Sequence, residues 1–412
     1  MKHYKLQDIR NIGFVGHGGS GKTSLAESVL YLTGVSDRLG KAGDASSVMD
    51  YDPEEIKRGH SISSSIAFCE FNSTKINLID TPGSNNFIAD TPATLRVVDG
   101  LVFVISAVEG MQFYTEKIWN WADELELPRI IFLNKMDHER ANAGPILEAI
   151  KTKLKKTPMF IHLPEETGEK FSGIVDLIEN KFFSYDRGGE GKGKPEGVPA
   201  DILDAMEISH AELIEAVAEV DDELIEKYLE SGELTVEEFF YGLKEGIKKG
   251  QLIPVLCGSA LQNVGVDLLL QAVVKYLPSP ENRAPVRAIK VKDDSEVTRS
   301  ANDPASALVF KTVADPYAGK LTLFRTFSGM IKGDSTIYNS TQEISERVGQ
   351  LYMLQGKKQL PVSEVSAGDI GAVVKLKQTV TGDSFSEADE KVVFPSVVFP
   401  LPVLSRVLVP KT

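Results

Sequence analysis

The chain has 412 residues, more than one ordinary domain holds, and this length predicts two to four domains. Hydrophobic residues make up 42% of the sequence and charged residues 25%, a balance that is typical of folded globular chains and excludes the disordered and fibrous classes. The formal net charge of −14 disfavours a protein that coats nucleic acid by neutralising phosphates, although a local basic face is compatible with it.

Cysteine usage and hydropathy indicate the compartment. The two cysteines, Cys69 and Cys257, belong to no CxxC pair, so the sequence favours neither a disulfide framework nor a cysteine-rich zinc site and fits a reducing environment. The longest apolar run, residues 101–105, is far shorter than a membrane span, and the start of the chain lacks the pattern of an export signal. We therefore expect a cytoplasmic protein with no membrane anchor.

Short apolar segments alternate with helical patterns through most of the first 284 residues. Residues 11–15 predict a strand that enters a glycine-rich turn, and residues 22–33 predict the helix after it. Further strands are predicted at residues 76–79, 101–105, 130–133 and 253–256. This alternation favours an α/β fold with a mainly parallel sheet covered by helices.

The alternation is interrupted between residues 158 and 252, where we expect an inserted α+β subdomain. A strand-like piece at 173–185 leads through a Gly- and Lys-rich loop at 187–197 to acidic helices. The first helix is predicted from apolar residues spaced by three, four or seven: Ile202, Met206, Leu213, Val217, Val220 and Leu224. Fifteen acidic residues and four lysines lie between positions 200 and 249, so this stretch alone carries −11 of the net charge.

A change of period marks a second domain. Residues 277–285 contain three prolines and predict a linker. Beyond it the apolar period becomes two, which predicts strands at 307–313, 321–328, 335–339 and 370–376, with turns at 315–319, 329–334 and 366–369. Strands of this length and spacing suggest a small antiparallel β-barrel over residues 285–398.

The turn after the first strand carries the clearest chemical motif. It matches the phosphate-loop pattern GxxxxGK[ST], followed by Ser24, with the residues Gly16, His17, Gly18, Gly19, Ser20, Gly21, Lys22 and Thr23. In this pattern, backbone N–H groups surround phosphates, Lys22 reaches the β- and γ-phosphates, and the Thr23 hydroxyl binds Mg²⁺. A glycine turn without a ligand is the alternative, and the strand before the motif and the helix after it argue against that alternative.

Two further segments predict that the base is guanine. Asn134, Lys135 and Asp137 follow the strand at 130–133, and the Asp137 carboxylate can accept hydrogen bonds from the guanine N1 and N2 donors, which adenine does not offer. Another strand is followed by a segment where a backbone N–H could meet the guanine O6, formed by Gly258, Ser259 and Ala260.

A third loop follows the strand at 76–79 and completes the phosphate site. Its Asp80 is expected near Mg²⁺ and its Gly83 N–H near a γ-phosphate, as the template for phosphoryl transfer requires. The four elements occur in the order that guanine-nucleotide proteins need, so the expected cofactors are GTP or GDP and Mg²⁺.

With these motifs in place, the sequence resembles the translational GTPases, most closely bacterial elongation factor G and its paralogues. Residues 58–62 resemble the family's switch I motif RGITI, and residues 257–260, 276–280, 307–311 and 381–383 resemble further family strings. The resemblance implies a GTP-binding domain at 1–284, the barrel known as domain II at 285–398, and the start of a further domain at 399–412, so that the chain is a fragment. It also implies that Ser61 binds Mg²⁺, that GTP hydrolysis is coupled to translocation on the ribosome, and that the protein is a monomer.

The sequence departs from the family pattern at the residues that govern hydrolysis. Gly18 and Gly19 stand where the family has Ile and Asp, His60 and Ser61 replace Ile and Thr, and Ser84 replaces the histidine that orients the attacking water. Serine keeps a hydroxyl for Mg²⁺ at position 61, but at position 84 it has no imidazole. With Lys22, Gly83, Ser84 and His60 as the catalytic candidates, we expect nucleotide binding with slow or differently organised hydrolysis.

Several alternatives stay open on the sequence alone. Backbone groups and Mg²⁺ could position the water with little loss, or His60 could supply the missing imidazole. The protein could act on the ribosome in recycling or protection, or it could be a GTP-sensing regulatory module that barely hydrolyses. The acidic helices are either a solvated face or a surface facing the ribosomal stalk protein, which is the partner that the resemblance implies for the inserted subdomain.

Overall fold

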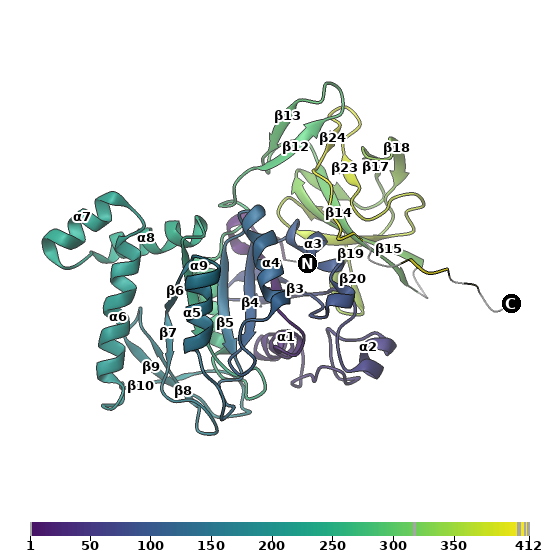
Figure 1. Ribbon diagram of the computed structural model, residues 1–412. Helices are drawn as coiled ribbons and strands as arrows, with labels where there is room; N and C mark the ends of the chain where they lie inside the picture. The colour runs from purple at the N-terminus through teal and green to yellow at the C-terminus, as the bar shows by residue number, and fades with distance from the viewer. Residues whose placement is uncertain (1, 316–318, 402–404, 408, 410–412) are drawn as a thin grey trace.

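The computed structural model describes residues 2–315, 319–401, 405–407 and 409. A central sheet with flanking helices carries the inserted helices on one side and a β-rich second domain on the other (Figure 1). Parts of the expected further domain, residues 402–404, 408 and 410–412, lie outside the described residues. No helix in the described ranges is long and apolar enough to cross a membrane.

The first domain is built on a seven-stranded sheet with the order β2-β3-β1-β4-β5-β11-β6. All neighbouring strands pair in parallel except β2, which runs antiparallel to β3 at the edge. The prediction of a mainly parallel α/β sheet is therefore confirmed. The strands span β1 Ile9–Val15, β2 Ser65–Phe71, β3 Thr74–Asp80, β4 Gly100–Ser106, β5 Arg129–Asn134, β6 Thr157–Phe160 and β11 Leu252–Cys257.

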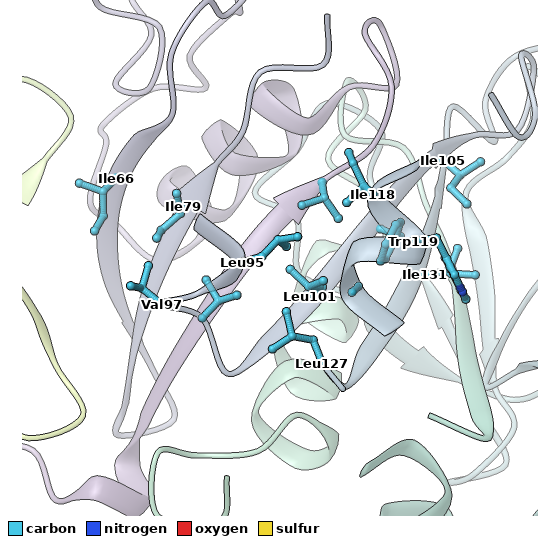
Figure 2. Close-up of a cluster of buried hydrophobic side chains, with 14 of the residues drawn as sticks. Ile66, Ile79, Leu95, Val97, Leu101, Ile105, Ile118, Trp119, Leu127 and Ile131 are labelled. Carbon is cyan, nitrogen blue, oxygen red and sulfur yellow. The ribbon is translucent and has the colours of Figure 1, made fainter. Parts of the chain in front are cut away.

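Helices cover both faces of this sheet. On one face, β4 residues Leu101, Phe103 and Ile105 pack with side chains from α3, α4 and α5, and Figure 2 shows part of this cluster around Trp119. On the other face, Val102 and Val104 join the buried residues of α1 and α9. Because both faces are buried, the strands read as continuous apolar runs. These helices span α1 Lys22–Leu32, α3 Asp90–Leu95, α4 Phe113–Glu124, α5 Gly144–Lys153 and α9 Val266–Tyr276.

The inserted part combines a four-stranded antiparallel sheet with three helices. The expected boundary at residue 158 falls inside β6, which belongs to the main sheet, so the chain leaves that sheet only after Phe160. The elements are β7 His162–Pro164, β8 Gly173–Asp176, β9 Lys181–Ser184, β10 Lys194–Glu196, α6 Leu203–Ala218, α7 Asp222–Ser231 and α8 Val236–Lys248.

Two predictions for the inserted part were too coarse. The strand-like piece at 173–185 is a hairpin of β8 and β9, because Asp176 Oδ1 accepts the N–H groups of Ile178 and Glu179 at 2.9 and 3.0 Å and turns the chain there. The first acidic helix ends at Ala218, because Asp221 caps the start of α7 through the Glu223 N–H. The apolar spacing continued across this break because Val217 of α6 and Leu224 of α7 are both buried next to Gly242 of α8.

The second domain is antiparallel, as expected. Eight strands in the order β18-β17-β23-β14-β15-β22-β19-β20 surround one core, in which Phe324 and Phe385 meet edge to face at 5.9 Å. Among the described residues, the edge strands β18 and β20 do not pair with each other. The strands span β14 Ser306–Asp315, β15 Gly319–Ser328, β17 Thr336–Asn339, β18 Ile344–Arg347, β19 Leu351–Gln355, β20 Lys358–Val362, β22 Ile370–Val374 and β23 Ser384–Ser386.

Two small sheets complete this domain. The turn expected at 329–334 contains β16, which pairs with β21, while the turn expected at 315–319 lies partly outside the described residues. The pairing of β16 allows the apolar Ile331 to join the domain core. The remaining strands are β12 Val286–Lys290, β13 Glu296–Arg299, β16 Met330–Lys332, β21 Glu364–Ser366 and β24 Val392–Val393.

Buried ion pairs join the two domains. Arg325 Nη2 lies 2.7 Å from Asp99 Oδ1, and Lys75 Nζ lies 2.7 Å from Asp369 Oδ2. The proline-rich segment predicted as a linker is packed into the same interface, where Arg283 donates to the Val98 carbonyl at 2.8 Å. Buried charges need a fixed geometry to offset their desolvation, so these pairs hold the second domain in one orientation.

Candidate nucleotide-binding site

The predicted site residues gather at one edge of the main sheet. The loops that follow β1, β3, β5 and β11 all leave the carboxyl ends of parallel strands, so they lie on the same side of the domain. These loops contain, in order, the phosphate-loop motif, Asp80 to Ser84, Asn134 to Asp137 and Gly258 to Ala260.

The phosphate loop is shaped by its glycines and closed by Lys22. Gly21 has φ +96°, and a side chain there would collide with the Asn134 amide, so glycine is needed on both counts. Lys22 Nζ donates to the carbonyl oxygens of Gly16 and His17, each at 2.9 Å, and so spans the loop. Burial lowers the pKa of Lys22, while the nearby carboxylates of Asp80 and Asp50 oppose that shift. The helix α1 starts at Lys22, and its free N–H groups favour an anion in the loop.

A chain of buried oxygens lies beneath the loop. Thr23 Oγ1 donates to Asp80 Oδ2 at 2.6 Å and lies 3.0 Å from Ser61 Oγ, which donates to Asp50 Oδ1 at 2.8 Å. The other carboxylate oxygens, Asp80 Oδ1 and Asp50 Oδ2, are buried and have no partner among the described residues. Burial raises the pKa of both carboxyl groups. Two unpartnered carboxylate oxygens beside two hydroxyls fit a hard divalent cation such as Mg²⁺.

Sequence reasoning missed Asp50 and the two glutamates that hold its segment. Glu27 Oε1 accepts the Ser47 hydroxyl and the N–H groups of Val48 and Met49, at 2.7 to 2.9 Å. Glu55 Oε1 accepts the N–H groups of Ile62 and Ser63 at 3.0 and 3.2 Å. Of the three acids, only Glu55 had a visible signal, since it closes a capping box with Asp52 at the start of α2, Pro53–Arg58.

The loop after β3 lies directly on the phosphate loop. A Cβ on Gly83 would lie 2.5 Å from Lys22 Nζ and 2.6 Å from Gly18 N, so the two loops touch through backbone atoms. A Cβ on Gly18 would lie 3.3 Å from the Gly83 carbonyl oxygen, tighter than ordinary contact. The glycine at position 18, where the family has isoleucine, therefore permits this close approach.

The two candidate hydrolysis residues lie at the outer side of the site. Ser84 begins a 3₁₀ turn, Asn85–Phe87, and its hydroxyl accepts the Asn86 N–H at 3.4 Å. The exposed His60 ring lies 6.0 Å from the Phe87 ring, and its Nδ1 lies 3.3 Å from the Ser61 carbonyl oxygen. The structure thus brings His60 close to the turn that starts at Ser84.

On the base side, Asn134 connects three loops. Its Nδ2 donates to the Ser20 carbonyl at 2.8 Å, and its Oδ1 accepts the Ala260 N–H at 2.9 Å. The N–H groups of Gly258 and Ser259 donate to Leu133 and Val264, so all three backbone groups proposed for the guanine O6 already have protein acceptors. A bound base has to compete with the Asn134 side chain for the Ala260 N–H.

Asp137 and Lys135 differ in whether their side chains have hydrogen-bond partners among the described residues. Asp137 is half-buried, and its carboxylate makes no hydrogen bond with any residue that the structure describes. Lys135 Nζ lies 3.1 Å from both carboxylate oxygens of Glu109, a partner that sequence reasoning did not foresee. An acid held open at this position fits a ligand with paired N–H donors.

The remaining residues of the phosphate-loop motif make contacts within the protein or adopt a conformation that the turn requires. His17 is buried, with Nδ1 3.3 Å from Thr115 Oγ1, and burial together with Lys22 lowers its pKa to about 4. Ser24 lies in the first turn of α1, where its carbonyl accepts the Ser28 hydroxyl at 2.9 Å. Gly19 has φ +81° and open space around it, so the aspartate that the family carries there has been replaced by a residue suited to the turn.

The glycine loop on a helix start, the oxygen cluster beneath it and the open carboxylate beside it define a phosphate-loop nucleotide-binding protein. Comparison with known families narrows this class. Residues 7–279 match the family model described as the elongation factor Tu GTP binding domain, and residues 304–388 match elongation factor G domain 2. The first match spans more than half of the chain, so the chain belongs to this family of GTP-binding domains, which implies binding of a guanine nucleotide.

Among solved structures, the chain is similar to a crystal structure of a protein from Thermus thermophilus. The TM-score is 0.83 with 29% sequence identity over 96% of this chain. The match covers 56% of the Thermus protein, so this chain spans little more than half of that protein's length.

Proposed function

We propose that this chain is the GTP-binding portion of a translational GTPase resembling elongation factor G. In this proposal it binds GTP with Mg²⁺ and couples the nucleotide state to a conformational change on the ribosome that serves translocation. Hydrolysis is slow or differently organised, because Ser84 lacks the imidazole of the family's histidine, while the chemical groups that bind phosphate, Mg²⁺ and guanine persist.

One observation carries the proposal. Asp80 Oδ1 and Asp50 Oδ2 are buried without partners beside the hydroxyls of Thr23 and Ser61, directly below the phosphate loop. Leaving charged oxygens buried and unpaired is costly unless a cation or a proton offsets them. A Mg²⁺–nucleotide complex supplies such a cation, and the adjacent Lys22 supplies a donor to its phosphates.

The chain's own residues have separate tasks in this mechanism. Lys22 and the N–H groups of the loop bind the β- and γ-phosphates, and Asp137 selects guanine through its N1 and N2 donors. Thr23, Ser61, Asp80 and Asp50 would hold Mg²⁺, which when bound neutralises phosphate charge. The Gly83 N–H is the proposed donor to the γ-phosphate, because the Gly83 loop lies directly against the phosphate loop.

Ser84 limits the hydrolytic step. A serine hydroxyl neither reaches as far as an imidazole nor titrates near neutral pH, and here it accepts the Asn86 N–H at 3.4 Å. Positioning of the attacking water is then left to backbone groups and the metal. We expect a ribosome-stimulated rate well below that of a form with histidine at this position.

Nucleotide affinity and turnover of the full-length protein, with and without ribosomes, test the proposal. We expect GDP and a non-hydrolysable GTP analogue to bind with full affinity only when Mg²⁺ is present. We also expect Ser84→His to raise ribosome-stimulated turnover by about 100-fold or more, the contribution typical of general acid–base catalysis. Ser84→Asn is the matched control, since it adds bulk without an imidazole. Equal turnover of the unchanged protein and Ser84→His would overturn the claim of slow hydrolysis.

A specific contact makes His60 the second hydrolysis candidate. Its ring lies next to Phe87 in the turn that Ser84 begins, so an imidazole is available from the opposite loop. Single-turnover hydrolysis on ribosomes should fall on replacing His60 with Ala if this ring orients water. An unchanged rate removes His60 from the mechanism.

Ser84 and His60 both lie at the outer side of the site, away from the buried groups that bind the nucleotide. This position favours little hydrolysis, so a GTP-sensing module is the second candidate function. Such a module binds GTP and releases it with little hydrolysis, so its ribosome-stimulated rate stays near its intrinsic rate. A stimulated rate far above the intrinsic one excludes this function and favours translocation, recycling or protection.

A further inference from the structure

One ammonium group from the second domain reaches the nucleotide-binding domain. Lys311 lies on β14, and its side chain is only 13% exposed. Its Nζ donates to the Ser63 hydroxyl, to the Ser64 carbonyl at 2.6 Å and to Asp90 Oδ2 at 2.9 Å. All three partners belong to the first domain, so the contact crosses the domain interface.

These partners follow the two loops expected to read the γ-phosphate. Ser63 and Ser64 come just after Ser61, which contacts Thr23, and Asp90 begins the helix α3 that follows the Gly83–Ser84 loop. Asp90 Oδ2 also accepts the Ser63 hydroxyl at 3.0 Å and the Ser64 N–H at 2.7 Å. Lys311 and Asp90 thus connect the segments that directly follow these two loops.

The Lys311 ammonium stabilises the charged form of the Asp90 carboxylate. Burial would raise the pKa of Asp90, yet the Lys311 ammonium and the hydrogen bonds from Lys311, Ser64 and Ser63 outweigh burial and hold that pKa below its usual value. A bulge in β14 between Val309 and Lys311 shifts the register with β15 just before this lysine. Bulges re-aim side chains, so the strand geometry itself favours the reach of Lys311 across the interface.

A second contact from the second domain lies at the two ends of the segment that contains Ser61, residues 48–66. The Gly356 N–H, in the turn between β19 and β20, donates to the Ile66 carbonyl at 2.8 Å, and a side chain at Gly356 would collide with the Val48 carbonyl. Val48 lies two residues before Asp50 and is held by Glu27. The second domain therefore contacts the segment from residue 48 to residue 66 on both sides of Ser61.

Buried ion pairs fix the second domain on the first domain. The Arg325–Asp99 and Lys75–Asp369 pairs are buried and lie elsewhere in the same interface. A lysine extending from a fixed domain restrains the loops that it touches. A restraint at Ser63 and Asp90 favours the arrangement in which the Ser61 hydroxyl stays beside Thr23.

We propose that Lys311 is a positioning residue that holds the Ser61 loop and the Gly83 loop together, so that the second domain contributes to selective binding of the γ-phosphate. This inference rests on the proposed function, because it assumes that the site binds GTP. Ser61 and Gly83 serve the γ-phosphate and the metal, whereas Asp137 and most of the phosphate loop serve GDP equally. Loss of Lys311 should therefore weaken GTP more than GDP.

The test compares the affinities of GDP and a non-hydrolysable GTP analogue, with Mg²⁺, in the full chain. Lys311→Met is expected to lower the affinity for the GTP analogue about tenfold while changing the GDP affinity less than about twofold, a coupling of the usual size between sites. Lys311→Arg keeps the charge and should restore part of the preference. Lys332→Met, on an exposed part of β16, is the matched control and should behave as the unchanged chain.

Two further variants guard against misfolding and non-specific loss. Lys311→Met with Asp90→Asn removes both charges, so no carboxylate is left unpaired, and it should show the same loss of preference. Ser63→Ala combined with Lys311→Met should cost less than the sum of the two separate changes. Equal effects of Lys311→Met on GDP and on the GTP analogue, or no effect on either, would overturn the inference. Failure of the unchanged chain to bind either nucleotide would instead overturn the proposed function.

Discussion

The two sides of the nucleotide site differ in how firmly the fold holds them. On the phosphate and metal side, Lys22, Thr23, Asp80 and Ser61 are buried, and each makes hydrogen bonds at 3.0 Å or less. On the hydrolysis side, Ser84 is half-buried with one bond of 3.4 Å, and His60 is exposed. A buried polar group needs fixed partners, whereas an exposed one can rely on water. Changes are therefore easier to accommodate on the hydrolysis side, where Ser84 stands in place of the family's histidine and His60 in place of its isoleucine.

Removal of Lys22, on the buried side, should have the largest effect on nucleotide binding. Lys22→Ala deletes the donor proposed for the β- and γ-phosphates, and truncating one partner of a buried charged contact costs about 2–5 kcal/mol. We expect the affinities for GTP and GDP to fall at least ~30-fold in a titration with fluorescent nucleotides. Lys248→Ala, an exposed lysine on α8, is the control. Unchanged affinity in Lys22→Ala would show that the buried side does not bind phosphate.

The base side is tested by changing which hydrogen bonds it accepts. Asp137→Asn replaces an acceptor of two N–H donors with an amide, so GTP affinity should fall by about 1–3 kcal/mol, the usual value of a paired hydrogen-bond contact to a base. Xanthosine triphosphate, which carries a carbonyl in place of the 2-amino group, should gain affinity. Competition binding measures both. Glu139→Gln, two residues away and exposed, should change neither affinity, and retained guanine preference in Asp137→Asn would contradict the assignment.

The buried histidine on the binding side predicts a pH effect on stability. Burial and Lys22 lower the pKa of His17 to about 4, below the value near 6.5 of an unfolded histidine. The unfolded chain therefore takes up a proton that the folded chain refuses, and stability present above pH 6.5 is lost as the pH falls toward 4. His17→Gln should remove up to about 2 kcal/mol of the loss in unfolding free energy between pH 7 and pH 5.

Urea unfolding at the two pH values measures this difference. His60→Gln is the matched control, because its ring is exposed on the hydrolysis side, and it should lose stability with pH as the unchanged chain does. If His17→Gln and His60→Gln behave alike, the contrast between a buried and an exposed side does not hold for the histidines.

The smallest expected effect concerns the acidic inserted helices, which are remote from both sides of the site. Glu223, Glu226 and Glu230 are exposed on α7, and replacing all three with Gln should slow ribosome association at low salt a few-fold and weaken its salt dependence. The same change at the exposed Glu124, Glu126 and Glu148 of the first domain is the control. Equal salt dependence in all three proteins would leave the acidic helices as a solvated surface.

The sequence predicted the architecture well where local patterns were strong. Continuous apolar strands and the motif around Lys22 indicated a parallel sheet with a phosphate loop, and the fold confirms the sheet. Helix breaks were harder to predict, because Val220 and Leu224 keep a helical spacing across the gap between α6 and α7. A cap at Asp221 outweighs a periodicity that serves one shared core.

What the sequence by itself determined were the candidate residues for phosphate and guanine, since their chemistry depends on short motifs at the ends of strands. Tertiary structure alone decided which distant acids and bases join them. Asp50 and Glu27 carry no motif, yet the fold places Asp50 beside Ser61 and ties Glu27 to residues 47–49. Lys311 lies more than two hundred residues from Ser63 and meets it only because buried ion pairs fix the second domain on the first. Local chemistry can be read from neighbours in the chain, whereas contacts across domains depend on packing that no short segment encodes.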